Sequence, residues 1–145
     1  MHILKIQTEK RLLGDLGERA ARRFLRRTGH RIVKKNFVAD SHEIDIIAED
    51  KETLIFVEVK TRTLGKIHPN EPRPASSVDA KKQQSIIKAA TVYTAYNPIN
   101  KKKRFDIVEV YVNENNGKYS VAEIKHLKGT FNRNTAFSPT ERNKK

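Results

Sequence analysis

Cysteine is absent from the 145-residue sequence, which excludes both a disulfide framework and a zinc site built on thiolates. The sequence also lacks any stretch of about 18 apolar residues, the length that a helix needs to span a bilayer. Its start contains no apolar run of the kind found in secretory signal peptides. We therefore expect a cytoplasmic protein that has no contact with the membrane.

Acidic residues are few relative to basic ones. The chain has 17 Asp and Glu against 30 Lys and Arg, which gives a formal net charge of +13. An excess of this size is typical of proteins that bind polyanions, so nucleic acid is the expected partner. The charge alone does not distinguish DNA from RNA. The alternative interpretation is a solvated basic surface that keeps a small protein soluble.

The length and composition suit one domain with a modest core, because 37% of the residues are hydrophobic and 32% are charged. We place this domain at residues 9–131. Residues 132–145 are polar and basic, and we expect them to form a flexible tail. No internal repeat is visible in the sequence.

Apolar residues at helical spacing predict an amphipathic helix over residues 9–28, ended by Gly29. Its apolar stripe consists of Leu13, Leu16, Ala20 and Phe24. Basic side chains project from the opposite side of the helix, namely Arg19, Arg22, Arg23 and Arg26. This basic face suits contacts with phosphate groups and equally suits exposure to solvent.

Runs of apolar and β-branched residues predict five strands. They cover residues 31–38, 42–48, 53–60, 104–112 and 119–127. Residues 61–77 are rich in proline, so we expect a loop there that faces the substrate. A second helix, capped by Ser77 or Asp79, then runs to about residue 96. The order αβββαββ predicts an α/β fold in which helices flank a central mixed sheet.

Two charged residues occupy positions where an inner strand should carry apolar ones. Glu58 and Lys60 lie on one face at the end of the third strand, and Asp45 lies among isoleucines on the preceding strand. A four-residue loop at positions 49–52 places Asp45 opposite Phe56, one diagonal step from Glu58. A shift of one residue at each end of the loop places Asp45 directly opposite Glu58. In both registers two carboxylates converge beside a lysine.

Two carboxylates beside a lysine suit a cation that prefers oxygen ligands, such as Mg²⁺ or Mn²⁺, with the backbone carbonyl of Val59 as a further ligand. In phosphodiester hydrolysis such an ion polarises the phosphoryl oxygen and activates water, while Lys60 orients the nucleophile and offsets developing charge. The alternative interpretation of Asp45, Glu58 and Lys60 is an ion-pair network at the sheet edge. The five histidines, His42 among them, form no spaced pair, so zinc is not expected.

Several ordered segments give the sequence a closer resemblance. They are GDLGERAARRFLRRTGHRIVKKNF, EIDIIA, FVEVKTRT, VDAKKQQSIIKAATVY and RFDIVEVYV. Together they resemble the bacterial YraN-like family of predicted endonucleases, which is similar to the Holliday-junction-resolvase branch of the PD-(D/E)xK nuclease superfamily. The resemblance runs over residues 13–131 and implies a restriction-endonuclease-like fold.

The resemblance implies metal-binding roles for Asp45 and Glu58 and a catalytic role for Lys60. It also implies an auxiliary acidic role, including metal binding, for Glu18, which lies at the border of the apolar stripe of the first helix. Glu43 is the other candidate for the auxiliary acid, because it precedes Asp45 by two residues on the same strand.

The same resemblance bears on two further positions. Where the family usually has glycine, this chain has His42, so the local turn is expected to differ, because glycine tolerates positive φ far better than histidine. Lys82 matches a lysine of the family on the second helix. The full set of expected nucleic-acid contacts is Arg19, Arg22, Arg23, Arg26, Arg62 and Lys82.

The sequence therefore predicts a metal-dependent endonuclease that hydrolyses DNA phosphodiester bonds. A preference for branched or single-stranded DNA follows from the resemblance and from the lack of a recognisable base-reading module. Junction resolvases make two cuts, so a homodimer is expected by analogy. The alternatives are a nucleic-acid-binding scaffold that acts through a partner without useful catalysis, and an RNA-binding protein.

Overall fold

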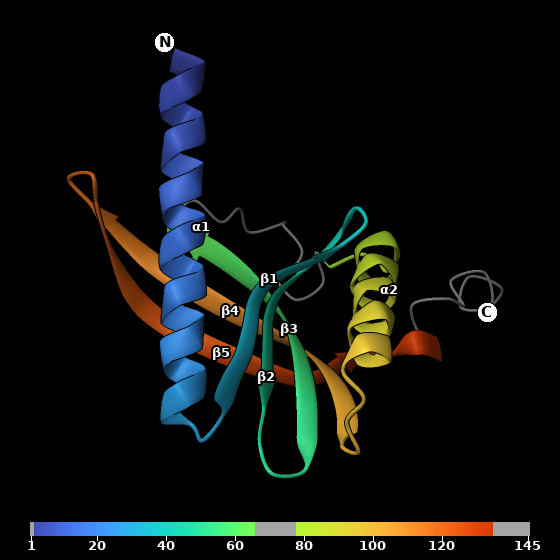
Figure 1. Ribbon diagram of the computed structural model, residues 1–145. Helices are drawn as coiled ribbons and strands as arrows, with labels where there is room; N and C mark the ends of the chain where they lie inside the picture. The colour runs from blue at the N-terminus through green and yellow to red at the C-terminus, as the bar shows by residue number, and fades with distance from the viewer. Residues whose placement is uncertain (1, 66–77, 135–145) are drawn as a thin grey trace, which may run out of the picture.

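The computed structural model describes residues 2–65 and 78–134 (Figure 1). Its elements are α1 (His2–Arg27), β1 (Arg31–Ala39), β2 (His42–Glu49), β3 (Thr53–Thr63), α2 (Ala80–Tyr96), β4 (Lys102–Asn115) and β5 (Lys118–Phe131). The predicted order αβββαββ is confirmed. Residues 61–63, which were expected in the loop, instead continue β3. The rest of that loop and most of the expected tail lie outside the described residues.

The five strands form one mixed sheet in the order β1-β2-β3-β4-β5. Neighbouring strands are antiparallel, except that β3 and β4 are parallel and are connected through α2. The two helices cover opposite faces of the sheet (Figure 1). The predicted α/β fold with a central sheet between helices is therefore confirmed, and the arrangement is compatible with a restriction-endonuclease-like fold.

Each helix packs on its own hydrophobic layer. The layer beneath α2 includes Phe56 and Ile107, and the layer beneath α1 includes Val57 and Val108. The side chains of successive residues in the inner strands thus point into opposite layers, as expected for strands that are covered on both faces. Glu58 and Lys60 follow Phe56 in this alternation and lie on the face that α2 covers.

The buried stripe of α1 differs from the predicted one. Gly17, Ala21 and Leu25 are buried. Leu13, Leu16, Ala20 and Phe24, the predicted stripe, are only partly covered. Leu13, Leu16 and Ala20 pack against the edge of the core beneath α1, so the predicted stripe is confirmed as its border, while the centre of the contact falls on Gly17, Ala21 and Leu25. The helix also begins at His2 instead of residue 9, since residues 2–8 contain no glycine or proline that would end it.

Gly17 marks the closest approach of α1 to β3. A Cβ atom at this position would lie 1.8 Å from Thr61 Oγ1 and 2.9 Å from Thr61 Cβ. Thr61 is β-branched and lies in a strand, so its side chain has little freedom to turn away. Gly17→Ala should therefore lower the free energy of unfolding by about 1–3 kcal/mol, the usual cost of overpacking, in a urea titration.

Gly14→Ala is the matched control for this substitution, because a Cβ atom at Gly14 meets nothing within 4 Å. Alanine should raise the free energy of unfolding there by about 0.5–1 kcal/mol, since glycine weakens a helix. Equal stabilities of the two variants would show that α1 does not depend on close contact with β3 at Gly17.

The other element ends follow local signals. The Asp79 side chain caps α2 by accepting a hydrogen bond from the Lys82 backbone N–H at 2.8 Å. Gly29, with a φ of 92°, ends α1. Asn116 and Gly117, with φ values of 54° and 78°, form the turn between β4 and β5. Neither helix of the described residues is long and apolar enough to cross a membrane.

Candidate active site

The register between β2 and β3 places Asp45 level with Glu58. Ile46 pairs with Val57, and the ladder continues from there to the end of β2. The register that placed Asp45 opposite Phe56 is therefore wrong, and the alternative register is correct. Because both carboxylates belong to neighbouring strands, the sheet itself brings them together.

The loop differs from the predicted one because Glu49 belongs to the strand. Glu49 is buried and forms ion pairs with Arg31 and with Lys101, whose Nζ lies 2.8 Å from its carboxylate. Asp50 organises the turn instead, since its Oδ1 accepts hydrogen bonds from two backbone N–H groups of the loop at 2.9 and 2.8 Å. Glu49, expected in the loop, is thus a strand residue whose partners Arg31 and Lys101 lie far away in the sequence.

Asp45 lies outside regular strand pairing on both sides. Toward β3, its Oδ2 accepts a hydrogen bond from the Val59 backbone N–H at 2.8 Å, past the last pair of the ladder. The carbonyl of Val59 points to the same edge, because the N–H and C=O of one strand residue share a side. Toward β1, the residue across from Asp45 is Asn36, whose φ of 51° is left-handed. Departures of this kind re-aim side chains and are frequent at functional sites.

Glu58 is buried, with 4% of its surface exposed. Burial first, then the charge of Asp45 and the contact between the two carboxyl groups, raise the pKa of Glu58 to about 8, although Lys82 and Lys60 lower it. The Nζ atoms of Lys82 and Lys60 lie 3.6 and 3.8 Å from Glu58 Oε2. Glu58 Oε1 is buried and has no hydrogen-bond partner among the described residues. The site therefore holds a carboxyl oxygen that can accept a further ligand.

Glu18 reaches the same region from α1. Burial, followed by the charges of Asp45 and Glu43, raises the pKa of Glu18 to about 7, while Arg22 lowers it. Glu18 also lines a cleft of about 270 Å³ together with Val59. Glu43 is exposed. Both candidate auxiliary acids thus lie near Asp45. Of the two, Glu18 lines the cleft that Val59 also lines.

Some of the expected nucleic-acid contacts lie at the site. Lys82 and Arg22 stand beside its carboxylates. Arg62 lies further along β3, on the face of Lys60 by strand alternation, and is half-buried. These basic groups surround the acidic centre from two helices and one strand.

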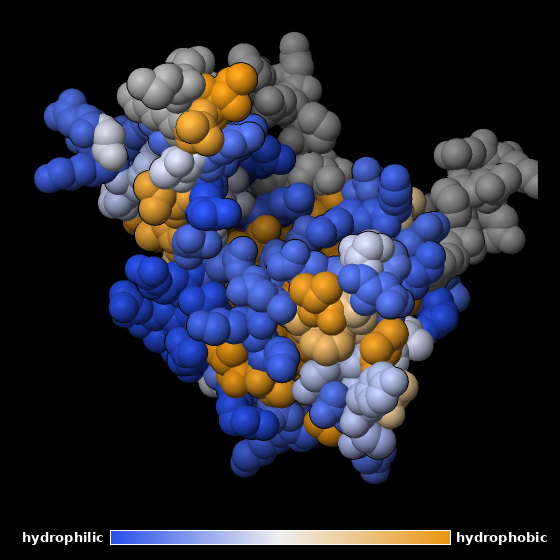
Figure 2. Space-filling view, turned by 45° about the horizontal axis from the view of Figure 1, so that its top comes forward, coloured by the Kyte–Doolittle hydropathy of each residue, from blue (hydrophilic) through white to orange (hydrophobic). Residues whose placement is uncertain are grey.

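The remaining expected contacts lie elsewhere on α1. Arg26 is exposed. Arg19 and Arg23 line a groove that α1 forms with β5, on the flank of the helix that faces away from Glu18. The surface seen in Figure 2 is mostly hydrophilic, with smaller apolar patches between the hydrophilic side chains. Within the basic face expected for α1, Arg22 therefore lies toward Glu18, whereas Arg19 and Arg23 lie toward β5.

Gly17 and Asn36 were not predicted as residues of the site, although both shape it. Gly17 lets α1 approach β3 beside Glu18, and Asn36 lies across from Asp45. The sequence does contain a signal for the close packing at Gly17. A glycine inside a helical pattern lowers helix stability, so its presence often indicates a close contact with another element. No sequence signal marks Asn36, since a left-handed residue within a strand leaves no periodic pattern.

The groups that converge at the site offer oxygen atoms to a cation. Asp45, Glu58 and the carbonyl of Val59 would hold it, with Glu18 as a further carboxylate on the side of the cleft. The described residues contain no preformed group of three or more His, Cys, Asp or Glu side chains at metal-binding spacing. The unpartnered Glu58 Oε1 and the repulsion between the two acids fit Mg²⁺ or Mn²⁺, because a divalent cation would compensate both carboxylates.

Comparison with known proteins places the chain in a family. Residues 17–110 match the family described as "Uncharacterised protein family UPF0102". The UPF0102 protein of Caldanaerobacter subterraneus is 39% identical over 126 residues, which cover 86% of this chain and 98% of the relative. That of Acetivibrio thermocellus is 39% identical over 128 residues, covering 86% and 95%. The chain therefore belongs to the UPF0102 family, the YraN-like family that its sequence motifs resemble.

Proposed function

We propose that this protein is a metal-dependent endonuclease that hydrolyses DNA phosphodiester bonds, with a preference for branched or single-stranded DNA. The observation that carries the proposal is the contact between the Asp45 and Glu58 carboxyl groups, one of them buried with an unpartnered oxygen. An ion-pair network built only for stability would pair its buried oxygens. A cation site explains why two acids lie together and why one oxygen lacks a partner.

The residues of the site have separate tasks in this proposal. Asp45, oriented by the Val59 N–H, binds the cation together with Glu58. A Mg²⁺ or Mn²⁺ bound there would polarise the phosphoryl oxygen and activate the attacking water. Lys60 orients that water and offsets the negative charge that develops on the scissile phosphate. Lys82, near the start of α2, faces the same carboxylate and binds an adjacent phosphate.

The DNA backbone would follow the cleft between α1 and the end of β3. Lys10 and Thr61 line this cleft with Glu18, and Arg22 stands next to them. Because the chain carries a net charge of +13, contacts with phosphates would supply most of the affinity. A DNA substrate would place the enzyme in the cytoplasm, and two cuts at a four-way junction would call for a homodimer.

Metal-dependent cleavage is the direct test. The purified protein should cut at least one of single-stranded, flap and four-way DNA once Mg²⁺ or Mn²⁺ is added, and calorimetry should detect binding of the metal. Asp45→Asn should abolish both, because it removes an ionised ligand. Asp40→Asn changes an exposed residue in the turn between β1 and β2. This control variant should leave metal binding and DNA cleavage unchanged.

Two results would contradict the proposal in different ways. If the wild type binds metal but cuts no DNA or RNA on the panel, the protein is a nucleic-acid-binding scaffold. If Asp45→Asn binds metal as tightly as the wild type, the cation site lies elsewhere in the chain. Cleavage of RNA alone would change the substrate while keeping the chemistry.

A further inference from the structure

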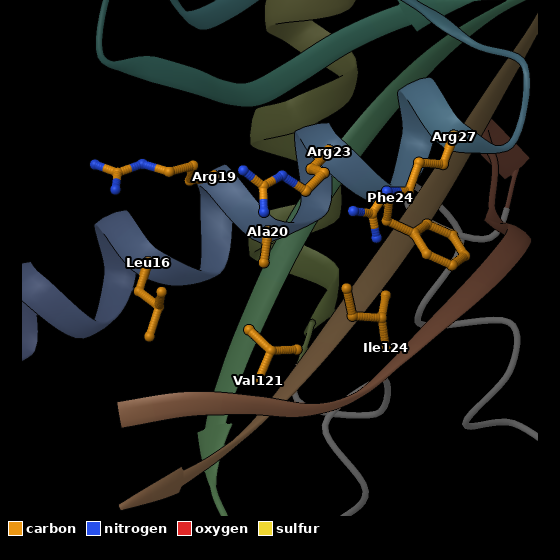
Figure 3. Close-up of a pocket in the computed structure, with 8 residues that line it drawn as sticks. All are labelled: Leu16, Arg19, Ala20, Arg23, Phe24, Arg27, Val121 and Ile124. Carbon is orange, nitrogen blue, oxygen red and sulfur yellow. The ribbon is translucent and has the colours of Figure 1, made fainter. Parts of the chain in front are cut away.

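A groove of about 360 Å³ lies between α1 and β5 (Figure 3). Its apolar walls consist of Leu16, Ala20 and Phe24 from α1 and Val121 and Ile124 from β5. Its rim carries Arg19, Arg23 and Arg27, which we call the arginine row. Figure 3 shows the apolar side chains of α1 extending toward β5. The groove shares no lining residue with the cleft at Glu18.

The walls of the groove are apolar surface that the fold covers only in part. Val121 is 41% exposed. The ring of Phe24 meets His126 edge-on, with 6.2 Å between the ring centroids. β5 is an edge strand whose pairing with β4 shifts register next to Val121, and irregular edges of this kind resist pairing with another strand. A ligand is therefore expected to insert side chains into the groove instead of extending the sheet.

The arginine row defines what else the ligand must carry. Its members follow one another at intervals of four residues, which sets them about 6 Å apart along the helix. Within residues 2–65 and 78–134, none of the three forms an ion pair. Guanidinium groups bind carboxylates and phosphates through paired hydrogen bonds. The ligand should thus combine a row of negative groups with apolar side chains.

The lining of the groove distinguishes between ligands of this kind. Nucleic acids stack their bases on aromatic faces, whereas four of the five wall residues are aliphatic. A second copy of this chain is disfavoured as the occupant of this groove, because it would bring its own net charge of +13 to the arginine row. An acidic protein segment supplies apolar side chains for the walls and carboxylates for the arginine row.

We infer that this groove docks a short acidic segment of a partner protein. One or two large apolar side chains of the segment enter between Phe24 and Val121, and neighbouring Asp or Glu residues pair with the arginine row. Apolar anchors in a pocket surrounded by charged contacts are the usual source of affinity in such interfaces. The inference does not depend on the proposed nuclease activity, because the groove lies on the other flank of α1.

Selection from a phage-displayed library of random 12-residue peptides tests the inference on the full chain. Selected peptides should be rich in Asp and Glu and should carry at least one large apolar residue. Binding of a labelled synthetic copy, followed by fluorescence anisotropy, should weaken at least about tenfold in Arg19→Ser/Arg23→Ser, because two charge-assisted contacts are lost. Val121→Asp should weaken peptide binding as well, because it places a charge in the apolar wall of the groove.

Lys34→Ser/Lys35→Ser is the matched control, since it removes the same charge from exposed positions on β1 that do not line the groove, and it should change the affinity less than about twofold. The inference is overturned if the selected peptides lack acidic residues, or if both double variants weaken binding equally. It is also overturned if an oligothymidylate of equal charge displaces the peptide more effectively than unlabelled peptide does, because the groove would then be a nucleic-acid site.

Discussion

Lys60→Ala should slow metal-dependent DNA cleavage by about a hundredfold or more, in line with the loss of one preorganised electrostatic contact. The Lys60 Nζ lies 3.8 Å from Glu58 Oε2, and the backbone of Lys60 is held in the central strand β3 by its pairing with β4. Alanine leaves Asp45 and Glu58 in place, and metal affinity measured by calorimetry should persist. DNA affinity should change little, since Lys60 is one of 30 basic residues.

Lys81→Ala provides the control for this prediction. Lys81 is an exposed lysine next to Lys82 on α2. Lys81→Ala removes one positive charge, as Lys60→Ala does, but it changes no residue of the candidate site. Single-turnover cleavage should be unchanged in this variant. If Lys60→Ala cuts DNA as fast as Lys81→Ala does, Lys60 has no role in the chemical step.

The order of the elements could be predicted because each carries its own periodicity. Residues 42–48 and 53–60 read as strands because their apolar residues are continuous and β-branched, and both are inner strands of the sheet. Glu58 and Lys60 could be identified among these apolar residues, because a charged side chain in a covered strand costs free energy unless another group compensates it. Local pattern was therefore sufficient for the fold and for the two central residues of the candidate site.

The register of the hairpin could not be predicted, because it depends on contacts far apart in the sequence. The sequence places Glu49 in a run of four polar residues that separates the two strands, yet Lys101 and Arg31 compensate its charge within the sheet. With Glu49 in the strand, Glu49 pairs with Leu54 and Ala48 pairs with Ile55, and this shifted register brings Asp45 level with Glu58. No local signal reports a partner that lies 52 residues away.

The division of the basic face of α1 also escaped the sequence pattern. Periodicity assigns Arg19 and Arg22 to one polar side of the helix, but it does not say what stands next to each of them. In the fold, Arg22 lies by Glu18 and Arg19 lies by β5. The difference arises from the position of α1 over the sheet, which Gly17 and Ala21 allow and which large apolar residues do not reveal.

Glu58→Gln should make the metal-free protein more stable at alkaline pH. The pKa of Glu58 is raised from its ordinary value of 4.5 to about 8, so between these pH values the folded chain holds a proton that the unfolded chain has released. Stability therefore falls as pH rises from about 4.5 to about 8, because the unfolded state binds fewer protons. Glutamine keeps the shape of the protonated acid and cannot ionise. The free energy of unfolding of Glu58→Gln should therefore not fall over this pH range on account of residue 58.

The expected gain is about 2–4 kcal/mol in the free energy of unfolding at pH 8.5, and it should nearly vanish at pH 4.5. Urea titrations at the two pH values in the presence of a chelator measure it. Glu123→Gln, which changes an exposed acid on β5, should show no gain at either pH. Added Mg²⁺ should stabilise the wild type and leave Glu58→Gln unaffected, because this variant lacks one of the two ligating carboxylates.

The outcome separates the two interpretations of the acidic pair. If Lys60 and Lys82 already neutralise Glu58 in a structural ion-pair network, replacing Glu58 leaves both lysines without this partner, and Glu58→Gln is less stable than the wild type. If the pair awaits a cation, the metal-free protein carries a repulsion that costs stability, and the glutamine relieves it. In that second case the metal-free fold gives up stability at a site that a cation would complete, which is the trade of stability for function that natural proteins often make.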